Sequence, residues 1–67
     1  MELNFLAVKI ESNGGTLDGH IEVGKIETIN RAAQDPNKTV VYLAHRMLVL
    51  HENYDSFCKR LEEVCHE

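Results

Sequence analysis

The most regular pattern of apolar and polar residues lies near the C-terminus of the chain. Over residues 53–66, apolar side chains recur every three or four positions, and polar or charged side chains fill the positions between them. This spacing is the period of an amphipathic helix, so it predicts a helix over residues 53–66. Asn53 is suited to cap the first turn, because its amide oxygen can accept hydrogen bonds from free backbone N–H groups. The predicted apolar stripe comprises Tyr54, Phe57, Cys58, Leu61, Val64 and Cys65.

The central segment has patterns typical of strands. Residues 39–43 combine β-branched and aromatic side chains, which favour a strand, and residues 47–51 form a second apolar run. Residues 44–46 (Ala-His-Arg) are predicted to join them as a hairpin connection. A single strand over residues 39–51 is the alternative, but strands are usually about 3–10 residues long. The preceding residues 31–38 are expected to form a loop with a type I turn at Asp-Pro-Asn-Lys.

The first part of the chain reads as a strand and a tight turn. Residues 2–11 carry apolar groups at both alternating sets of positions, which favours a strand covered on two faces over a helix. Residues 12–15 (Ser-Asn-Gly-Gly) predict a hairpin turn, because Asn-Gly and Gly-Gly readily adopt positive φ.

The sequence after this turn predicts a further turn, a short strand and a segment of undecided conformation. Asp18-Gly19 predicts a second turn, and residues 20–23 alternate strictly, as a short strand does. After a break at residues 24–25, residues 26–29 fit either a helical turn or a short bent strand.

Together these elements predict an α+β fold: a four- to five-stranded antiparallel β-sheet followed by one C-terminal amphipathic helix (ββββα). With 67 residues the chain is expected to form a single domain over residues 1–67. A domain this short buries only about 60% of its unfolded surface, so we expect association into a homo-oligomer to stabilise it. Because one helix cannot cover a sheet that is apolar on both sides, the second face is the expected contact surface.

The two cysteines lie seven positions apart on the predicted helix, at Cys58 and Cys65. Seven helical residues span about 10.5 Å along the axis, whereas a disulfide needs Cα atoms within about 7 Å. We therefore expect free, buried thiols, with a bond between chains as the alternative. The N-terminus lacks the pattern of a signal peptide, and no apolar run approaches the roughly 20 residues that span a bilayer. The expected location is cytoplasmic, without membrane contact.

The charge pattern argues against nucleic acid as a partner. The net charge is −4, and the basic residues are scattered singly apart from the pair Lys59-Arg60. Nucleic-acid binding draws most of its affinity from clustered positive charge, so this class of function is disfavoured.

Four histidines raise the question of a metal site. They are His20, His45, His51 and His66, and His45 and His51 are separated by five residues, at the wide limit of zinc-binding spacing. CxxC, HxH and HExxH motifs are absent from the sequence. We therefore expect no metal ligands and no cofactor.

An active site is not predicted either. The carboxylates are spread over separate elements, and the pair of Cys58 and His51 could act as a nucleophile and base, but Cys58 lies on the apolar stripe and is expected in the core. Gly14-Gly15-Thr16 is interpreted as part of the hairpin turn, since it lacks the motif of a phosphate loop. The prediction is that the protein is not an enzyme and has no catalytic residues.

Short motifs in the second half of the chain carry a family resemblance. They are residues 23–29 (VGKIETI), 35–43 (DPNKTVVYL) and 48–54 (LVLHENY), followed by the helix over residues 55–61. In this order they resemble the small FlbD/SwrD-type flagellar and swarming-motility proteins, over roughly residues 21–61. The resemblance implies strands followed by a closing helix, and a motility or regulatory role. A similar strand pair and helix occur in LytTR-type DNA-binding domains.

The chain departs from the FlbD/SwrD pattern in several places. Residues 44–46 (Ala-His-Arg) replace the turn glycine, and the loop over residues 31–37 is longer. The N-terminal strand and the Gly-Gly hairpin also differ.

The leading hypothesis is a small, non-enzymatic, homo-oligomeric interaction or regulatory module that binds a protein partner through a sheet edge or an uncovered face. Tyr42, His45, Arg46 and Tyr54 are the candidate interaction residues, because the tyrosines combine an aromatic face with a polar tip. One alternative is a small-molecule or nucleotide binder, with a site between subunits lined by Tyr42, His45 and Arg46. Others are a phage-type inhibitor of a host protein and a LytTR-like DNA-binding module.

Overall fold

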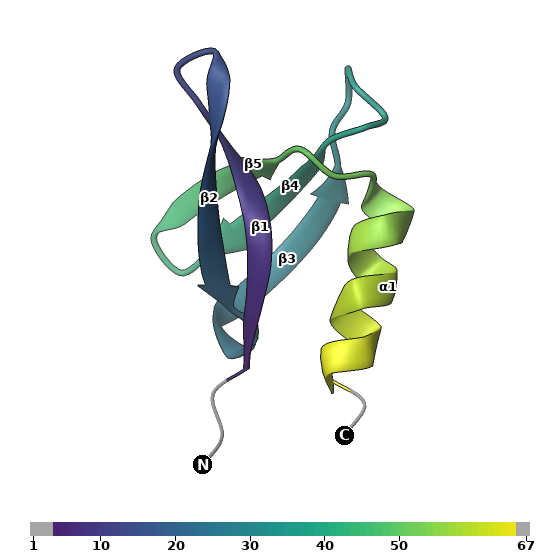
Figure 1. Cartoon of the computed structure of the whole chain (residues 1–67). Helices are drawn as coiled ribbons and strands as arrows, with labels where there is room; N and C mark the ends of the chain where they lie inside the picture. The colour runs from purple at the N-terminus through teal and green to yellow at the C-terminus, as the bar shows by residue number, and fades with distance from the viewer. Residues whose placement is uncertain (1–3, 66–67) are drawn as a thin grey trace.

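The computed structural model describes residues 4–65, with Cys65 described by its backbone alone. Within this range five β-strands precede one α-helix, which confirms the predicted α+β fold (Figure 1). The elements are β1 (Phe5–Ser12), β2 (Gly15–Glu22), the short 3-10 helix η1 (Val23–Lys25), β3 (Ile26–Arg31), β4 (Thr39–Leu43), β5 (Arg46–Leu50) and α1 (Tyr54–Cys65).

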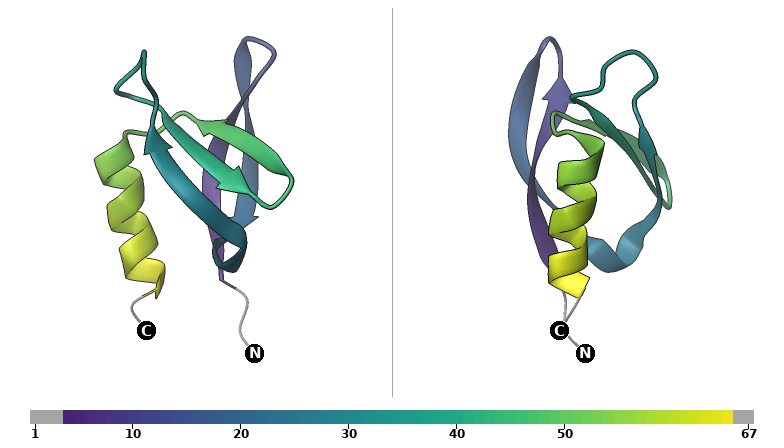
Figure 2. Two further views of the ribbon diagram at one scale, coloured as in Figure 1. Left: turned by 180° about the vertical axis from the view of Figure 1, so that it is seen from behind. Right: turned by 90° about the vertical axis from the view of Figure 1, so that its right-hand side faces the viewer.

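The five strands form one antiparallel sheet in the order β2-β1-β5-β4-β3. β2 and β3 follow one another in the chain yet lie at opposite edges, and only the three residues of η1 connect them. A flat five-stranded sheet would separate its edge strands by about 19 Å, whereas three residues of 3-10 helix span about 6 Å. The sheet therefore has to curl, and Figure 1 and Figure 2 show its edge strands converging at η1.

β1 and β5 are joined over a much shorter length than the other neighbouring strands. β1 and β2 are in register over eight residue pairs, whereas Ile10 and Leu50 form the one registered pair between β1 and β5 in the described part of the chain. The N–H of His51 also donates to the backbone oxygen of Lys9 at 2.9 Å. We call this junction the seam. It connects the β1-β2 hairpin to the sheet formed by β3, β4 and β5.

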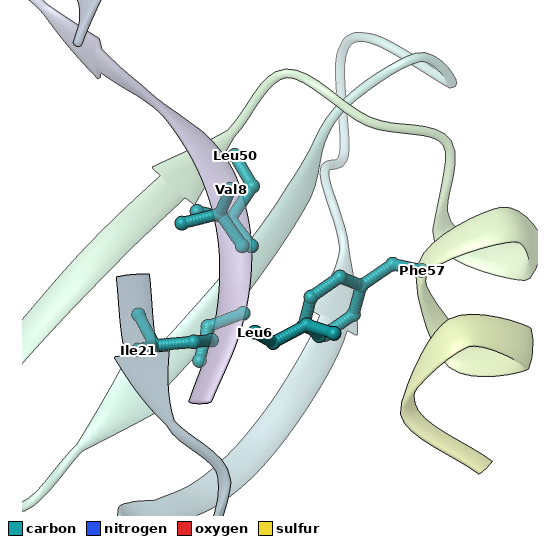
Figure 3. Packing of buried hydrophobic residues seen from close by; sticks show 6 residues of the cluster. Leu6, Val8, Ile21, Leu50 and Phe57 are labelled. Atoms are coloured by element: carbon teal, nitrogen blue, oxygen red, sulfur yellow. The ribbon is translucent and has the colours of Figure 1, made fainter. Parts of the chain in front are cut away.

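The core lies on the inner, concave face of the curled sheet. The ring of Phe57 projects from α1 toward Leu6 of β1 (Figure 3), and Phe57, Val41 and Leu50 have no exposed surface. Because this cluster takes side chains from the hairpin, from the three-stranded part and from the helix, it packs all parts of the fold together. Its members are Leu6, Val8, Ile21, Val41, Leu50 and Phe57.

The helix begins where the sequence predicts. The Oδ1 atom of Asn53 accepts hydrogen bonds from the backbone N–H groups of Asp55 (2.9 Å) and Ser56 (3.2 Å), so Asn53 is the expected N-cap. Leu61 and Val64 of the predicted stripe pack against the core. Cys58 is a free cysteine that is half-buried rather than fully buried, and the expected core position of the Cys65 side chain lies outside the described atoms.

Arg60 connects the helix to β1 by a side-chain hydrogen bond, on the side of β1 that faces β5. It donates to Oε1 of Glu52 at 2.6 Å and to the backbone oxygen of Ala7. β5 has diverged from β1 at Ala7, so the helix satisfies a carbonyl that the neighbouring strand does not reach.

The predicted strands and turns of the central segment are present, but the second strand covers residues 46–50 rather than 47–51, and the loop starts after Arg31, which belongs to β3. β4 has the predicted bounds, and β5 follows a two-residue turn at Ala44-His45, so Arg46 belongs to the strand rather than to the connection. In the preceding loop the N–H of Lys38 donates to the backbone oxygen of Asp35 at 3.1 Å, as the predicted turn requires. The segment over residues 26–29, for which two conformations fitted, is a strand with an irregularity between Ile26 and Thr28.

Two expectations for the first hairpin are wrong. Asp18 and Gly19 do not form a turn but lie inside β2, opposite Lys9 and Val8 respectively. Their turn signal is outweighed by a continuous ladder of cross-strand pairs, in which Lys9 Nζ binds Asp18 Oδ1 at 2.7 Å. β1 is also not covered on two faces, since the outward-facing Phe5 is 54% exposed.

Candidate functional site

The four candidate interaction residues lie in three different places. Tyr42 points away from the core, because its neighbour Val41 is buried and strand side chains alternate between faces. His45 and Arg46 lie at the β4–β5 turn, at the opposite end of the molecule from α1 (Figure 1, Figure 2). Tyr54 starts the helix. The expected grouping of Tyr42 with His45 and Arg46 is therefore not present within one chain.

Tyr42 belongs to an uncharged surface on the convex side of the sheet. It lies opposite Met47 on β5 and Thr28 on β3, and the next outward positions form the pair Val40 and Val49. Tyr42 is 40% exposed and Met47 is 53% exposed. We call this surface the outer face; it comprises Thr28, Asn30, Val40, Tyr42, Met47 and Val49.

The outer face is not covered by the helix. α1 packs on the concave side, where Phe57 meets the buried cluster. Residues 32–38 border the outer face at Val40 and Val49, and a hollow of about 440 Å³ lies between this loop and the two valines. Single exposed apolar side chains are common on proteins, whereas a contiguous patch indicates a contact surface.

His45 and Arg46 border a second hollow, of about 380 Å³, on the concave side of the sheet. Its apolar lining comes from Ile10, Ile21, Leu43 and Leu48, which continue the core face beyond the buried cluster. We call it the turn hollow. The polar residues of its lining are His20, Glu22, Lys25, His45 and Arg46.

Tyr54 contacts its own chain. The guanidinium of Arg31 lies 4.4 Å from the centroid of the Tyr54 ring, and Arg31 Nη2 donates to Asp55 Oδ1 at 3.1 Å. A hydrogen bond with the thiol of Cys58 raises the pKa of the Tyr54 hydroxyl above its ordinary value. These contacts hold β3 against the first turn of α1, which is a structural role for Tyr54.

A polar cluster near the seam could not be inferred from the sequence. The Oε1 atom of Glu11 accepts hydrogen bonds from Lys38 Nζ (2.6 Å) and His51 Nε2 (2.8 Å). The hydrogen bond from Lys38, and then that from His51, lowers the pKa of the Glu11 carboxyl, and Glu11 in turn raises the pKa of Lys38. The three residues come from separate parts of the chain, and no local motif marks them.

The described residues show no arrangement suited to metal binding. Between Asn4 and Val64, no group of three His, Cys, Asp or Glu side chains could hold a metal ion. His51 is engaged with Glu11, and His45 lies at the turn hollow. His66, the fourth histidine considered for metal binding, lies outside the described residues. Neither helix of the described residues has the length and apolar character needed to cross a membrane.

Comparison of the chain with protein-family models, with curated proteins and with solved structures finds no match.

Proposed function

We propose that this protein is a non-enzymatic interaction module that associates with a second copy of itself through the outer face. One observation carries the proposal. All six residues of the outer face are uncharged, in a chain of which 27% of residues are charged, and the helix packs on the other side of the sheet. Apolar surface left in water is a source of free energy for association.

The outer face suits contact with an identical copy. In a two-fold symmetric dimer each patch meets itself, so any charge at its centre would face a like charge. Tyr42 and Met47 present large apolar groups, and Thr28 and Asn30 beside them are polar but neutral. The nearby carboxylate of Glu11 is already paired with Lys38. Two such sheets can therefore stack face to face without electrostatic repulsion at the centre.

The small size of the core supports the same proposal. Six hydrophobic residues are buried in the described part of the chain, and β1 and β5 contribute a single registered pair. A domain of this length is marginally stable alone, and burial of Tyr42 and Met47 between two copies would add apolar area to its core.

The non-enzymatic part of the proposal is supported by the state of the charged groups. Lys9, Arg31, Lys38 and Arg60 each bind a carboxylate at the protein surface. Acid–base catalysis instead uses titratable groups placed in a desolvated cleft. The resemblance of residues 21–61 to the FlbD/SwrD family is consistent with a regulatory rather than an enzymatic role, and this role is part of the proposal.

Sedimentation velocity over a range of micromolar concentrations tests the association. The wild-type chain is expected to sediment as a dimer at the upper end of this range. Met47→Glu places a carboxylate at the centre of the patch and is expected to raise the dimer dissociation constant at least about tenfold, because like charges would be buried against each other.

Phe5→Glu is the matched control. Phe5 is 54% exposed, close to the 53% of Met47, but it lies on β1 outside the outer face. It is expected to leave the dissociation constant within about twofold of the wild type. A wild-type chain that remains a folded monomer throughout, or equal effects of the two substitutions, would refute the proposal.

A further inference from the structure

The turn hollow combines an apolar floor with a charged rim. Ile10, Ile21, Leu43 and Leu48 are all partly or fully buried members of the apolar face of the sheet, and each of them also lines the hollow. The helix closes the concave side at the other end, where Phe57 meets Leu6 (Figure 3). The hollow is thus the continuation of the core at the end that the helix leaves open.

The basic residues of the rim differ from most others in the chain. Lys9, Arg31, Lys38 and Arg60 each have a carboxylate oxygen within 3.1 Å. Among the described residues, the salt bridges include neither Lys25 nor Arg46, and both of these line the turn hollow. Glu22 is the one carboxylate in the lining, so the rim is net positive in a chain of net charge −4.

Two elements hold these cations at the hollow. Lys25 ends η1, whose first residue, Val23, donates its N–H to the backbone oxygen of Asn4 at 2.9 Å. Arg46 begins β5 opposite Leu43, so the strand register directs it to the face on which Leu43 lies. The cations therefore come from two different elements, one from the β2–β3 connection and one from the β4–β5 hairpin.

We infer that the turn hollow binds a small carboxylate with an apolar chain, of the fatty-acid type. The apolar chain packs against Ile10, Ile21 and Leu48, and the carboxylate lies at the rim between Arg46 and Lys25. A guanidinium can donate two parallel hydrogen bonds to one carboxylate, which matches a ligand with a single acidic head group. The volume of about 380 Å³ lies at the small end of the range for ligand pockets, about 300–1,000 Å³, and limits the ligand to a short or medium chain.

This inference is independent of the proposed self-association, because the turn hollow and the outer face lie on opposite sides of the sheet. Val41, Leu48 and Leu50 are on the concave side, whereas Tyr42 and Met47 are on the convex side. A chain that remains monomeric could still bind the ligand, and a dimer could form without it.

The test is a titration of the full chain, labelled with ¹⁵N, with sodium decanoate kept below its micelle-forming concentration. Saturable shifts are expected at the backbone amides of Ile10, Ile21, Leu43, Arg46 and Leu48. Decanol, which has the same chain and no carboxylate, is expected to bind at least about fivefold more weakly, because it cannot pair with the two cations.

Substitutions at the rim provide the matched comparison. Lys25→Gln and Arg46→Gln are each expected to weaken decanoate binding about fivefold. Lys59→Gln removes the same charge from an exposed position on α1, outside the hollow, and is expected to leave binding within about twofold. All three sites are solvent-exposed, so the spectrum of each variant should show an intact fold.

Three results would overturn the inference. One is the absence of saturable shifts at millimolar decanoate. The second is equal binding of decanol and decanoate, or an equal effect of Lys25→Gln and Lys59→Gln. The third is a set of shifts centred on Tyr42 and Met47, which would show nonspecific adsorption to the outer face.

Discussion

The hydroxyl group of Thr39, which is completely buried, donates a 2.8 Å hydrogen bond to the backbone oxygen of Glu52. Thr39 begins β4, and Glu52 lies in the segment between β5 and α1, so this bond connects the segment before the helix to an interior strand of the sheet. Thr39→Val keeps the shape of the side chain but leaves the Glu52 oxygen without its partner. We expect a loss of about 1–2 kcal/mol in the free energy of unfolding, measured by urea denaturation.

Thr16→Val serves as the control for the Thr39 experiment. Thr16 is an exposed strand residue on β2, so the same chemical change should alter the free energy of unfolding by less than about 0.5 kcal/mol. Equal losses at the two positions would show that the Thr39–Glu52 bond contributes nothing.

Asn53 has two roles that two substitutions can separate. Its Oδ1 caps α1, and its Nδ2 donates to the backbone oxygen of Pro36 at 3.2 Å. Asn53→Ala removes both contacts and is expected to cost about 1–2 kcal/mol of stability. Asn53→Asp keeps an oxygen for the cap and loses only the donor to Pro36, so it should recover most of this stability. Thermal or urea denaturation that ranks Asp no better than Ala would contradict the capping role.

The β1–β2 turn needs a glycine at position 14. Gly14 has φ of +83° and Asn13 has φ of +46°, as expected for a two-residue hairpin turn with positive φ at both positions. Gly14→Ala is expected to lower the free energy of unfolding by about 1 kcal/mol, because a Cβ atom disfavours this conformation. The control is Gly24→Ala, at a glycine without positive φ and with no atom within 4 Å of an added Cβ. It should be neutral or slightly stabilising, and a similar loss at both glycines would exclude the conformational explanation.

Stability should fall in acid, in part through Glu11. Hydrogen bonds from Lys38 and His51 lower the pKa of Glu11 in the folded protein, so the unfolded chain binds the proton more readily. The stabilisation is therefore present above the ordinary pKa of about 4.5 and is lost as the pH falls through the lower pKa of the folded state. Glu11→Gln should reduce the acid dependence of the free energy of unfolding, followed by urea denaturation between about pH 2 and pH 7.

Asp18 is the comparison for Glu11. Lys9 lowers the pKa of Asp18 as well, so the sign of the effect is the same. The Asp18 side chain is 85% exposed against 39% for Glu11, and water and salt screen its ion pair more strongly. Asp18→Asn should therefore change the acid dependence less than Glu11→Gln, and the reverse order would contradict this assignment.

The elements that were predicted correctly depend on local patterns. The helix follows from the spacing of Phe57, Leu61 and Val64, and its start from Asn53, all within twelve positions. The Asn13-Gly14 turn and the strand over residues 39–43 likewise depend on neighbouring residues. In each case the pattern that indicates the conformation lies in residues close together in the chain.

The errors occur where distant residues decide the outcome. Asp18-Gly19 is a turn signal, but its pairing with Val8 and Lys9, about ten positions earlier, keeps it in a strand. The Glu11–Lys38 and Glu11–His51 contacts join residues 27 and 40 positions apart, so a reading of local patterns cannot locate them.

The candidate interaction residues were separated by strand alternation. Tyr42 is close to His45 and Arg46 in the sequence, but the register that buries Val41 turns Tyr42 to the convex face and Leu43 to the concave face. The apolar floor beside Arg46 needs Ile10 and Ile21 from the other hairpin. Its existence depends on the curl of the sheet, which follows from the strand order and not from any single segment.

The seam has a consequence for the rate of folding. The β1-β2 hairpin and the sheet of β3, β4 and β5 each pair strands that are close in the chain, so they can form early. Ile10 and Leu50 are forty positions apart, so pairing them closes the longest loop between neighbouring strands of the sheet. This closure costs the most conformational entropy, and it forms only one registered residue pair. We therefore expect docking of these two parts to limit the rate of folding. Phe57 belongs to the core cluster that joins both parts, so its replacement by Ala should lower the refolding rate in stopped-flow measurements.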